Sequence, residues 1–208
     1  VAQVLSQPRF SLLFGHLSEF ERKAQILRAA RAIFIERGYL AARVEDIAAR
    51  AGLSKGAVYF YFTSKREVFD ALVDEELAVT ASFLTDAEAD ERPAVIKLVD
   101  LGRKYLDSFA GRFFLLMSEL AIRDEDLRKR VTAVHERFVV ATESVIAQGI
   151  KEGAFRQYDP RAVALFLKAF IDGLAGQSAV GMRPDVERLA NDGIRVLLTG
   201  LIATPDNP

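Results

Sequence analysis

The sequence predicts an all-α protein of about nine helices, with an N-terminal three-helix head and a larger helical-bundle body. Apolar residues recur at the three- and four-residue spacing of helices along most of the 208-residue chain. Serine, aspartate, proline and glycine stand where these helices would begin and end. No alternating pattern or hairpin signal indicates a strand.

The first expected helix begins at Ser18 or Glu19 and ends near Arg37. The Ser18 hydroxyl can cap its first turn, and Gly38 can stop it. Its inward stripe comprises Ile26, Ala30, Ile33 and Phe34. Residues 1–18 fit either a flexible arm or a short helix, and we assign them no role.

Two short helices joined by a tight turn follow between Arg43 and Lys65. Gly52 suits the left-handed backbone that often ends a helix, and Ser54 is placed to cap the next one. Val58 and Phe62, four residues apart, give the second helix one buried edge. This pattern is that of a helix-turn-helix, whose second helix lies in the major groove of DNA.

The remaining chain is also expected to be helical. Ser64 and Glu67 form a capping box for a helix from Lys65 to about Leu84, and a polar loop then spans residues 86–93. Pro160 and Pro184 each stand at an expected helix start. The helices expected after the loop cover residues 94–109, 112 to about 122, 125–152, 160 to about 180, and 184 to about 202.

Composition and charge exclude several kinds of functional site and favour others. The chain has no cysteine, which excludes disulfides and thiolate metal sites, and no histidine-containing motif suggests a catalytic set or a metal site. No apolar run approaches the ~20 residues that span a bilayer, and no secretory signal is evident, so we expect a cytoplasmic protein. Residues 19–66 carry a net charge of +5 and residues 67–208 a net charge of −7. A basic head on an acidic body suits a protein that presents one end to phosphates.

The stretch RKAQILRAARAIFIERGYLAARVEDIAARAGLSKGAVYFYFTSKREVF resembles the DNA-binding head of the TetR family of bacterial transcriptional regulators. The resemblance covers roughly residues 20–80, and its core reads VxxIAxxAGxSKGxxYxYF. FFLLMSELAIRDEDLRKR and EGAFR are similar to a common C-terminal variety of the family. The resemblance implies a helix-turn-helix domain at 19–66 (motif about 43–62) and an effector-binding and dimerisation domain at 67–204.

Carried over residue by residue, the resemblance implies a DNA-contacting surface around the second motif helix. Two positions depart from the usual pattern: Ala42 and Arg43 replace a pair of hydroxyl residues, and Phe60 stands where tyrosine or a polar residue is frequent. The competing interpretation is that the charges are ordinary solvated groups and the aromatics are core. A short helix cannot bury Tyr59 to Phe62 together, because they point around its whole circumference. The implied DNA-binding residues are Arg43, Val44, Lys55, Gly56, Ala57, Tyr59, Phe60, Tyr61 and Lys65.

The resemblance also implies a pocket in the body for an apolar or aromatic small-molecule effector, with no cofactor and no metal. Large apolar residues would line it, although each of them singly also fits a plain bundle core. Glu119 and His135 are the polar candidates. The expected pocket residues are Phe109, Phe113, Phe114, Met117, Leu120, His135, Phe138 and Phe170.

The last two helices are expected to form a homodimer interface, since they combine bulky and small apolar residues. We therefore expect a regulator, most often a repressor in this family, that reads a palindromic operator and is released by a ligand. The alternatives are a constitutive or architectural DNA-binding dimer without an effector, and, more distantly, a helical enzyme or protein-binding bundle. The expected interface residues are Phe166, Phe170, Gly173, Leu174, Ala175, Gln177, Ile194, Leu197, Leu198 and Leu201.

Overall fold

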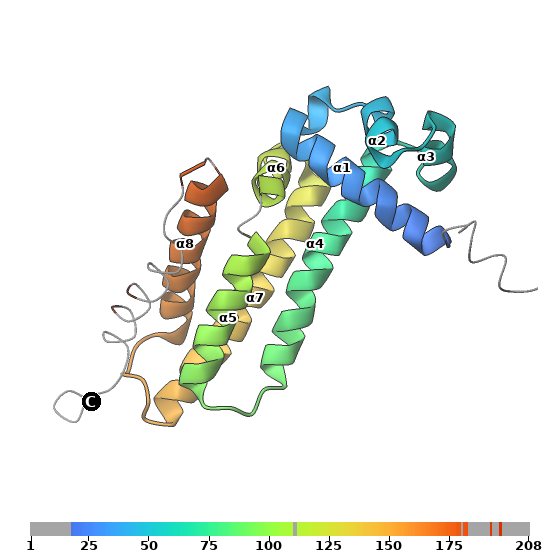
Figure 1. The fold of residues 1–208 in the computed structure, drawn as a ribbon. Coiled ribbons are helices and arrows are strands. Elements are labelled where there is room, and N and C mark those ends of the chain that lie inside the picture. The colour runs from blue at the N-terminus through green and yellow to red at the C-terminus, as the bar shows by residue number, and fades with distance from the viewer. Residues whose placement is uncertain (1–17, 110–111, 180, 183–191, 193–195, 197–208) are drawn as a thin grey trace, which may run out of the picture. The chain divides into compact units, whose positions relative to one another are not determined.

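The structure, a computed structural model, describes residues 18–109, 112–179, 181, 182, 192 and 196 (Figure 1). Across these residues it is all-α, as the sequence predicts, and contains no β-sheet. The ninth expected helix, beginning at Pro184, lies outside the described residues. The helices are α1 (Glu19–Ala41), α2 (Val44–Ala51), α3 (Lys55–Tyr61), α4 (Lys65–Glu88), α5 (Ala94–Phe109), α6 (Arg112–Ala121), α7 (Glu125–Lys151) and α8 (Pro160–Ala179).

The chain divides into two compact units between Leu72 and Val73, inside α4, whereas the sequence predicts a domain boundary at Arg66. Unit 1 contains α1 to α3 and the start of α4, and unit 2 contains the rest of α4 and α5 to α8. Over the described part of the chain, no helix has the length and apolar character needed to cross a membrane.

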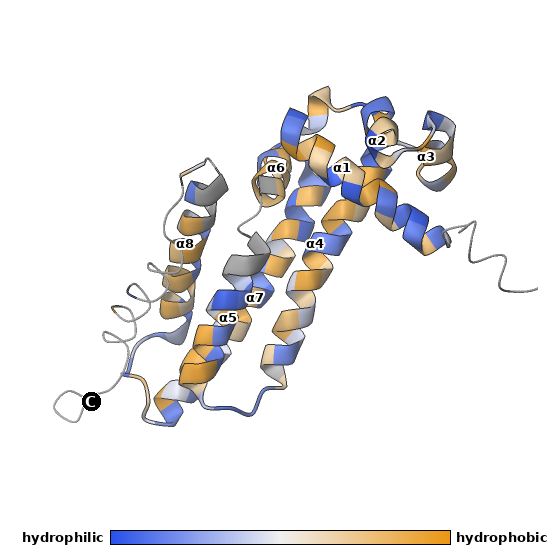
Figure 2. Ribbon diagram, viewed as in Figure 1, coloured by the Kyte–Doolittle hydropathy of each residue, from blue (hydrophilic) through white to orange (hydrophobic). Residues whose placement is uncertain are grey.

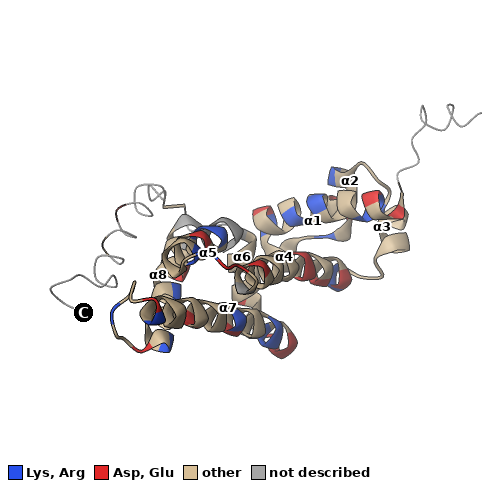
Figure 3. Ribbon diagram, turned by 90° about the horizontal axis from the view of Figure 1, so that it is seen from below, with Lys and Arg blue, Asp and Glu red and all other residues tan. Residues whose placement is uncertain are grey.

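Unit 1 is built as the sequence predicts around one face of α1. Ile26, Ala30, Ile33 and Phe34 are all buried. The Ser18 hydroxyl accepts from the Glu21 backbone amide at 3.2 Å, and the Glu21 carboxylate accepts from the Ser18 amide at 2.8 Å, which completes a capping box. Lys and Arg recur along α1 (Figure 3).

Gly38 interrupts α1 at the position where the sequence predicts a helix stop, because its backbone is not helical. The helix resumes beyond it to Ala41, and Gly38 forms a kink with φ of 73° and ψ of 163°. An L-residue adopts such a conformation only at a cost, which explains the glycine. The kink turns Tyr39 inward, where its ring packs 5.7 Å from Phe34 and 4.9 Å from Phe69, centroid to centroid.

Unit 2 is a bundle in which α7 packs against α5, α6 and α8. Hydrophobic and hydrophilic residues alternate around these helices (Figure 2). Asp124 caps α7 through the Leu127 amide at 3.0 Å, and Pro160 is the first residue of α8, as expected. One core cluster consists of Ala94, Leu98, Val145, Ile146 and Phe155.

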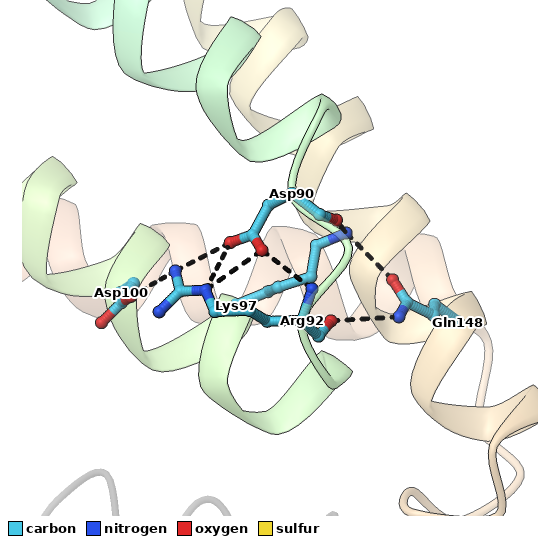
Figure 4. A network of polar contacts seen from close by, with 5 residues as sticks. All are labelled: Asp90, Arg92, Lys97, Asp100 and Gln148. Carbon is cyan, nitrogen blue, oxygen red and sulfur yellow. Dashed lines mark hydrogen bonds and ion pairs between the residues drawn. The ribbon is translucent and has the colours of Figure 1, made fainter.

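The connection between α4 and α5 is shorter than expected, because α4 continues to Glu88. A polar network holds it (Figure 4). The Arg92 guanidinium pairs with Asp90 at 2.7 Å and Asp100 at 2.6 Å, and holds the pKa of the Asp90 carboxyl at about 2. The buried Lys97 ammonium donates to the Asp90 carbonyl at 2.7 Å and to Gln148 Oε1 at 3.0 Å. Asp90, Arg92, Lys97 and Asp100 line a cavity of about 280 Å³.

Candidate functional site

The helix α3 presents an exposed aromatic and basic surface. The Ser54 hydroxyl caps it by accepting from the Ala57 amide at 3.1 Å, and Val58 and Phe62 bury its inner edge, as predicted. The Tyr59 side chain is 42% exposed and that of Phe60 is 82% exposed. The expectation that the four aromatics cannot all be buried is therefore confirmed.

The exposed aromatics are held in a defined arrangement. The rings of Phe60 and Tyr61 meet edge to face, with centroids 5.0 Å apart and an interplanar angle of 85°. The Lys55 ammonium lies 5.8 Å from the centroid of the Tyr59 ring, within the range of a cation–π contact. Lys55 thus contacts Tyr59, and Phe60 contacts Tyr61, on the same short helix.

Lys55 also pairs with an acidic residue that the sequence interpretation did not single out. Its Nζ lies 2.6 Å from Glu45 Oε1 on α2, although both side chains are more than half exposed. The hydrogen bond from Lys55 lowers the pKa of the Glu45 carboxyl, and the same bond raises the pKa of the Lys55 ammonium. A carboxylate therefore stands beside the basic surface of α3.

Gly56 is not required by the packing of the protein itself. A Cβ at this position would meet only Ser54 Oγ, at 3.9 Å, which is an ordinary contact. Its φ lies outside the left-handed region, so backbone strain does not demand glycine either. The position is exposed. Because glycine has no side chain, it leaves open space on the exposed face of α3.

The start of α2 exposes Arg43 and buries Val44. Arg43 is the N-cap residue in an extended conformation and makes no side-chain cap, as expected from the loss of a hydroxyl there. Its guanidinium lies on the exposed surface. The Val44 side chain is only 6% exposed. Because it packs in the core of unit 1, Val44 can offer a partner no more than its backbone.

Lys65 is placed differently from the rim charge that the sequence interpretation expects. Its ammonium donates to three backbone carbonyls at the end of α1: Tyr39 at 2.7 Å, Leu40 at 3.2 Å and Ala42 at 2.9 Å. It also lies 4.6 Å from the centroid of the Tyr39 ring. Partial burial lowers the pKa of this ammonium.

In unit 2, a polar cluster that sequence reasoning missed lies among α5, α7 and α8. The buried Tyr105 hydroxyl donates to Asp172 Oδ1 at 3.1 Å, and the buried Lys168 ammonium pairs with Asp172 Oδ2 at 2.5 Å. Burial and the Asp172 charge raise the pKa of Tyr105. Lys168 and Asp172 are one helical turn apart in sequence, but only the fold brings Tyr105 to them.

His135 belongs to this cluster, which we call the Tyr105 cluster: Tyr105, His135, Lys168 and Asp172. Burial, and next the positive charge of Lys168, lower the pKa of His135 to about 4, against an opposing effect of Asp172. Its ring lies 5.8 Å from that of Phe114, and the rings of Phe138 and Tyr105 lie 4.0 Å apart, centroid to centroid. The sequence interpretation named His135 but not its partners.

The expected pocket residues mostly point inward. Phe113, Phe114, Met117 and Phe138 are buried, and Leu120 and Phe170 are half-buried. Glu119 is exposed on α6 and does not join the Tyr105 cluster. Phe109 ends α5, but its side chain lies outside those that the structure describes.

The exposed face of α8 carries part of the expected dimer interface. Phe166 is 59% exposed, and Gly173 and Gln177 are exposed on the same side of the helix. Leu174 is only 6% exposed, so its side chain packs within its own chain and is not available to a partner. Phe170 is half-buried. The Ala175 side chain and Ile194, Leu197, Leu198 and Leu201 lie outside the described residues.

Comparison with known proteins finds a family match in each of the two units. Residues 26–72 match the model of bacterial regulatory proteins of the tetR family, and residues 107–200 match that of the BetI-type transcriptional repressor C-terminal domain. A probable HTH-type transcriptional regulator of Pseudomonas putida, ArpR, is 29% identical over 196 residues, which cover 85% of this chain and 91% of that protein. The fatty acid metabolism regulator protein of Bacillus subtilis is 23% identical over 182 residues, covering 85% and 94%.

A solved structure shares the fold. The transcriptional regulator from Saccharomonospora viridis in complex with choline superposes with a TM-score of 0.76 at 22% identity, over 88% of this chain and 99% of that one. The helix-turn-helix match to unit 1 and the C-terminal match within unit 2 agree with the architecture described above. The chain belongs to the TetR family of bacterial regulatory proteins: it is a DNA-binding transcriptional regulator, from a family that is not enzymatic.

Proposed function

We propose that this regulator represses transcription by binding a palindromic operator as a homodimer, and that a small molecule bound in unit 2 releases it. The observation that carries the proposal is the exposed surface of α3, where aromatic side chains and a lysine stand outside any core. Phe60 is exposed next to the exposed Tyr59 and Lys55, and neighbouring exposed aromatic and basic side chains favour a partner that covers them.

Each residue of this surface has a role suited to the major groove. Lys55 and Arg43 supply positive charge for phosphates, and Arg43 can also reach a guanine edge. Tyr59 and Tyr61 offer a hydroxyl to phosphate and a ring to bases. Phe60 carries no donor, so its contribution is an apolar contact such as that with a thymine methyl. Gly56 and Ala57 keep the helix thin enough for close approach, which fits the open space found at Gly56.

A dimer follows from the size of unit 1 and from the surface of α8. One short recognition helix contacts too few base pairs for specificity, whereas two copies read a twofold-symmetric site. Phe166, Gly173 and Gln177 recur at helical spacing on one exposed face of α8, and Phe166 is large and apolar. Phe166→Glu is expected to yield monomers in sedimentation, while Leu174→Met, at a buried position, leaves the dimer intact.

We place the effector site in the apolar interior of unit 2, beside the Tyr105 cluster. A buried lysine is costly unless it is paired, and such groups concentrate at functional sites. Proteins of this fold hold small molecules: choline in the S. viridis regulator and stearoyl-CoA in FadR of Bacillus subtilis. The buried phenyl rings favour an effector with an apolar or aromatic body, and the Tyr105 cluster supplies hydrogen bonds for its polar end.

Two experiments test these proposals. Selection of bound fragments from a random DNA pool, followed by sequencing, is expected to enrich an inverted repeat; an asymmetric motif, or no enrichment, would contradict the operator proposal. A thermal-shift screen of small molecules is then repeated with operator DNA present. A compound that raises the melting temperature and weakens DNA binding supports the effector proposal. If no class of compound does so, the regulator is constitutive.

A further inference from the structure

We infer that Lys65 supports DNA binding as a positioning residue, which ties together the two ends of the helix-turn-helix, rather than as a phosphate contact. This inference rests on the proposed α3 interface. It concerns which residue orients that interface, and it reverses the role that the family resemblance implies for this lysine.

The hydrogen bonds of Lys65 are the first step. A protonated lysine has three N–H donors and no acceptor. The structure gives the ammonium three backbone carbonyl partners, those of Tyr39, Leu40 and Ala42, at 2.7 to 3.2 Å. With these bonds formed, the ammonium keeps no donor for a phosphate oxygen. The Tyr39 ring, 4.6 Å from Nζ, also covers one side of the charge.

The position of Lys65 in the chain is the second step. It is the first residue of α4, and α3 ends at Tyr61, only four residues earlier. Its carbonyl partners lie immediately before Arg43, the N-cap of α2. Lys65 therefore joins the entrance of the helix-turn-helix, at residues 39–42, to its exit, at residues 62–65.

The third step explains why a cation is needed at this junction. The last carbonyls of a helix have no partner inside it, and they carry the negative end of the helix dipole. The kink at Gly38 leaves the final turn of α1 irregular, and the last turn contains no basic residue of its own. The Lys65 ammonium satisfies these carbonyls from outside. Without it, the segment that precedes Arg43 is no longer hydrogen-bonded to the start of α4, the helix that follows α3.

The test compares Lys65→Met and Lys65→Arg with Lys55→Ala, using the inverted repeat recovered by DNA selection. Dissociation constants are measured by fluorescence anisotropy over a series of salt concentrations. Removing one lysine–phosphate pair makes the slope of log K against log salt shallower by about 0.9. Lys65→Met is expected to weaken binding by at least about tenfold with an unchanged slope, whereas Lys55→Ala is expected to make the slope shallower.

Lys65→Arg separates the two roles further. A guanidinium serves a phosphate as well as an ammonium does, but its planar fork cannot donate to three converging carbonyls. We expect no recovery of affinity in this variant. A shallower slope for Lys65→Met together with normal affinity for Lys65→Arg would overturn the inference and restore the phosphate contact.

Amide hydrogen exchange, measured without DNA, gives a readout that does not depend on binding. We expect faster amide exchange at residues 42–47 in Lys65→Met but not in Lys55→Ala. A loss of protection throughout unit 1 in Lys65→Met would also support the positioning role. Unchanged exchange there would count against the positioning role. Unchanged affinity in Lys55→Ala would instead refute the α3 interface, so the two proposals fail separately.

Discussion

Acidification should destabilise unit 2 through His135, and the size of the effect follows from the Tyr105 cluster. Burial and the nearby Lys168 charge lower the pKa of His135 from 6.5 to about 4 in the folded protein. Asp172, also in the cluster, opposes this shift but does not cancel it. The native state therefore keeps His135 neutral at pH values where the unfolded chain binds a proton.

The sign and magnitude of the effect can be derived from this difference. Between about pH 6.5 and pH 4 the unfolded state holds more protons than the native state, so the free energy of unfolding falls as the pH falls. Each pKa unit corresponds to about 1.4 kcal/mol, which sets an upper value of about 3 kcal/mol for the whole transition. Between pH 7 and pH 5 the loss is about 2 kcal/mol.

Urea unfolding at pH 7, 6 and 5 measures this loss at a fixed protein concentration. His135→Gln is the matched variant, because glutamine stays neutral and retains hydrogen-bonding groups. Carboxylates that titrate in the same range affect both chains alike, so the difference between them isolates His135. If the variant loses as much stability as the parent between pH 7 and pH 5, the buried neutral state of His135 is refuted.

Two further substitutions test the core and the interface. Gly149→Ala would place a Cβ 2.1 Å from Cδ2 of the buried Phe155 ring, so it should destabilise unit 2 by about 1–3 kcal/mol despite the better helix propensity of alanine. Gly102→Ala, whose Cβ would lie 3.9 Å from Ile171, is the control, and equal losses for both would contradict the packing argument. Glu45→Gln removes the carboxylate paired with Lys55 and should raise operator affinity by about threefold at low salt, with a smaller gain at high salt. Reduced affinity in a gel-shift assay would show instead that Glu45 orients Lys55.

The sequence predicted what depends on local patterns. The buried stripe of α1, the Ser54 cap and the inner edge of α3 all follow from residues three or four apart, which helical geometry places on one face. The left-handed end of α2 at Gly52, with φ of 68°, follows from a single residue. Such features require no knowledge of the rest of the fold.

The sequence did not predict contacts that join distant segments. Tyr105 and Asp172 are 67 positions apart, and Lys65 and its carbonyl partners are 23 to 26 positions apart. The family pattern assigns Lys65 to DNA because the residue follows the recognition helix, but its surroundings depend on the kink at Gly38. Leu174 fitted an apolar interface by composition, yet the packing of α8 buries it in its own chain.

Direct DNA contact by α3 is the central claim, and one measurement tests it most directly. The dissociation constant of Lys55→Ala/Tyr59→Ala for the selected operator is compared with that of the parent at the same salt concentration, after circular dichroism and sedimentation have shown unchanged helicity and assembly. Removing one charged and one aromatic side chain from the interface of each protomer predicts binding weaker by about a hundredfold or more. Affinity within twofold of the parent would contradict the assignment of α3 as the DNA-reading surface.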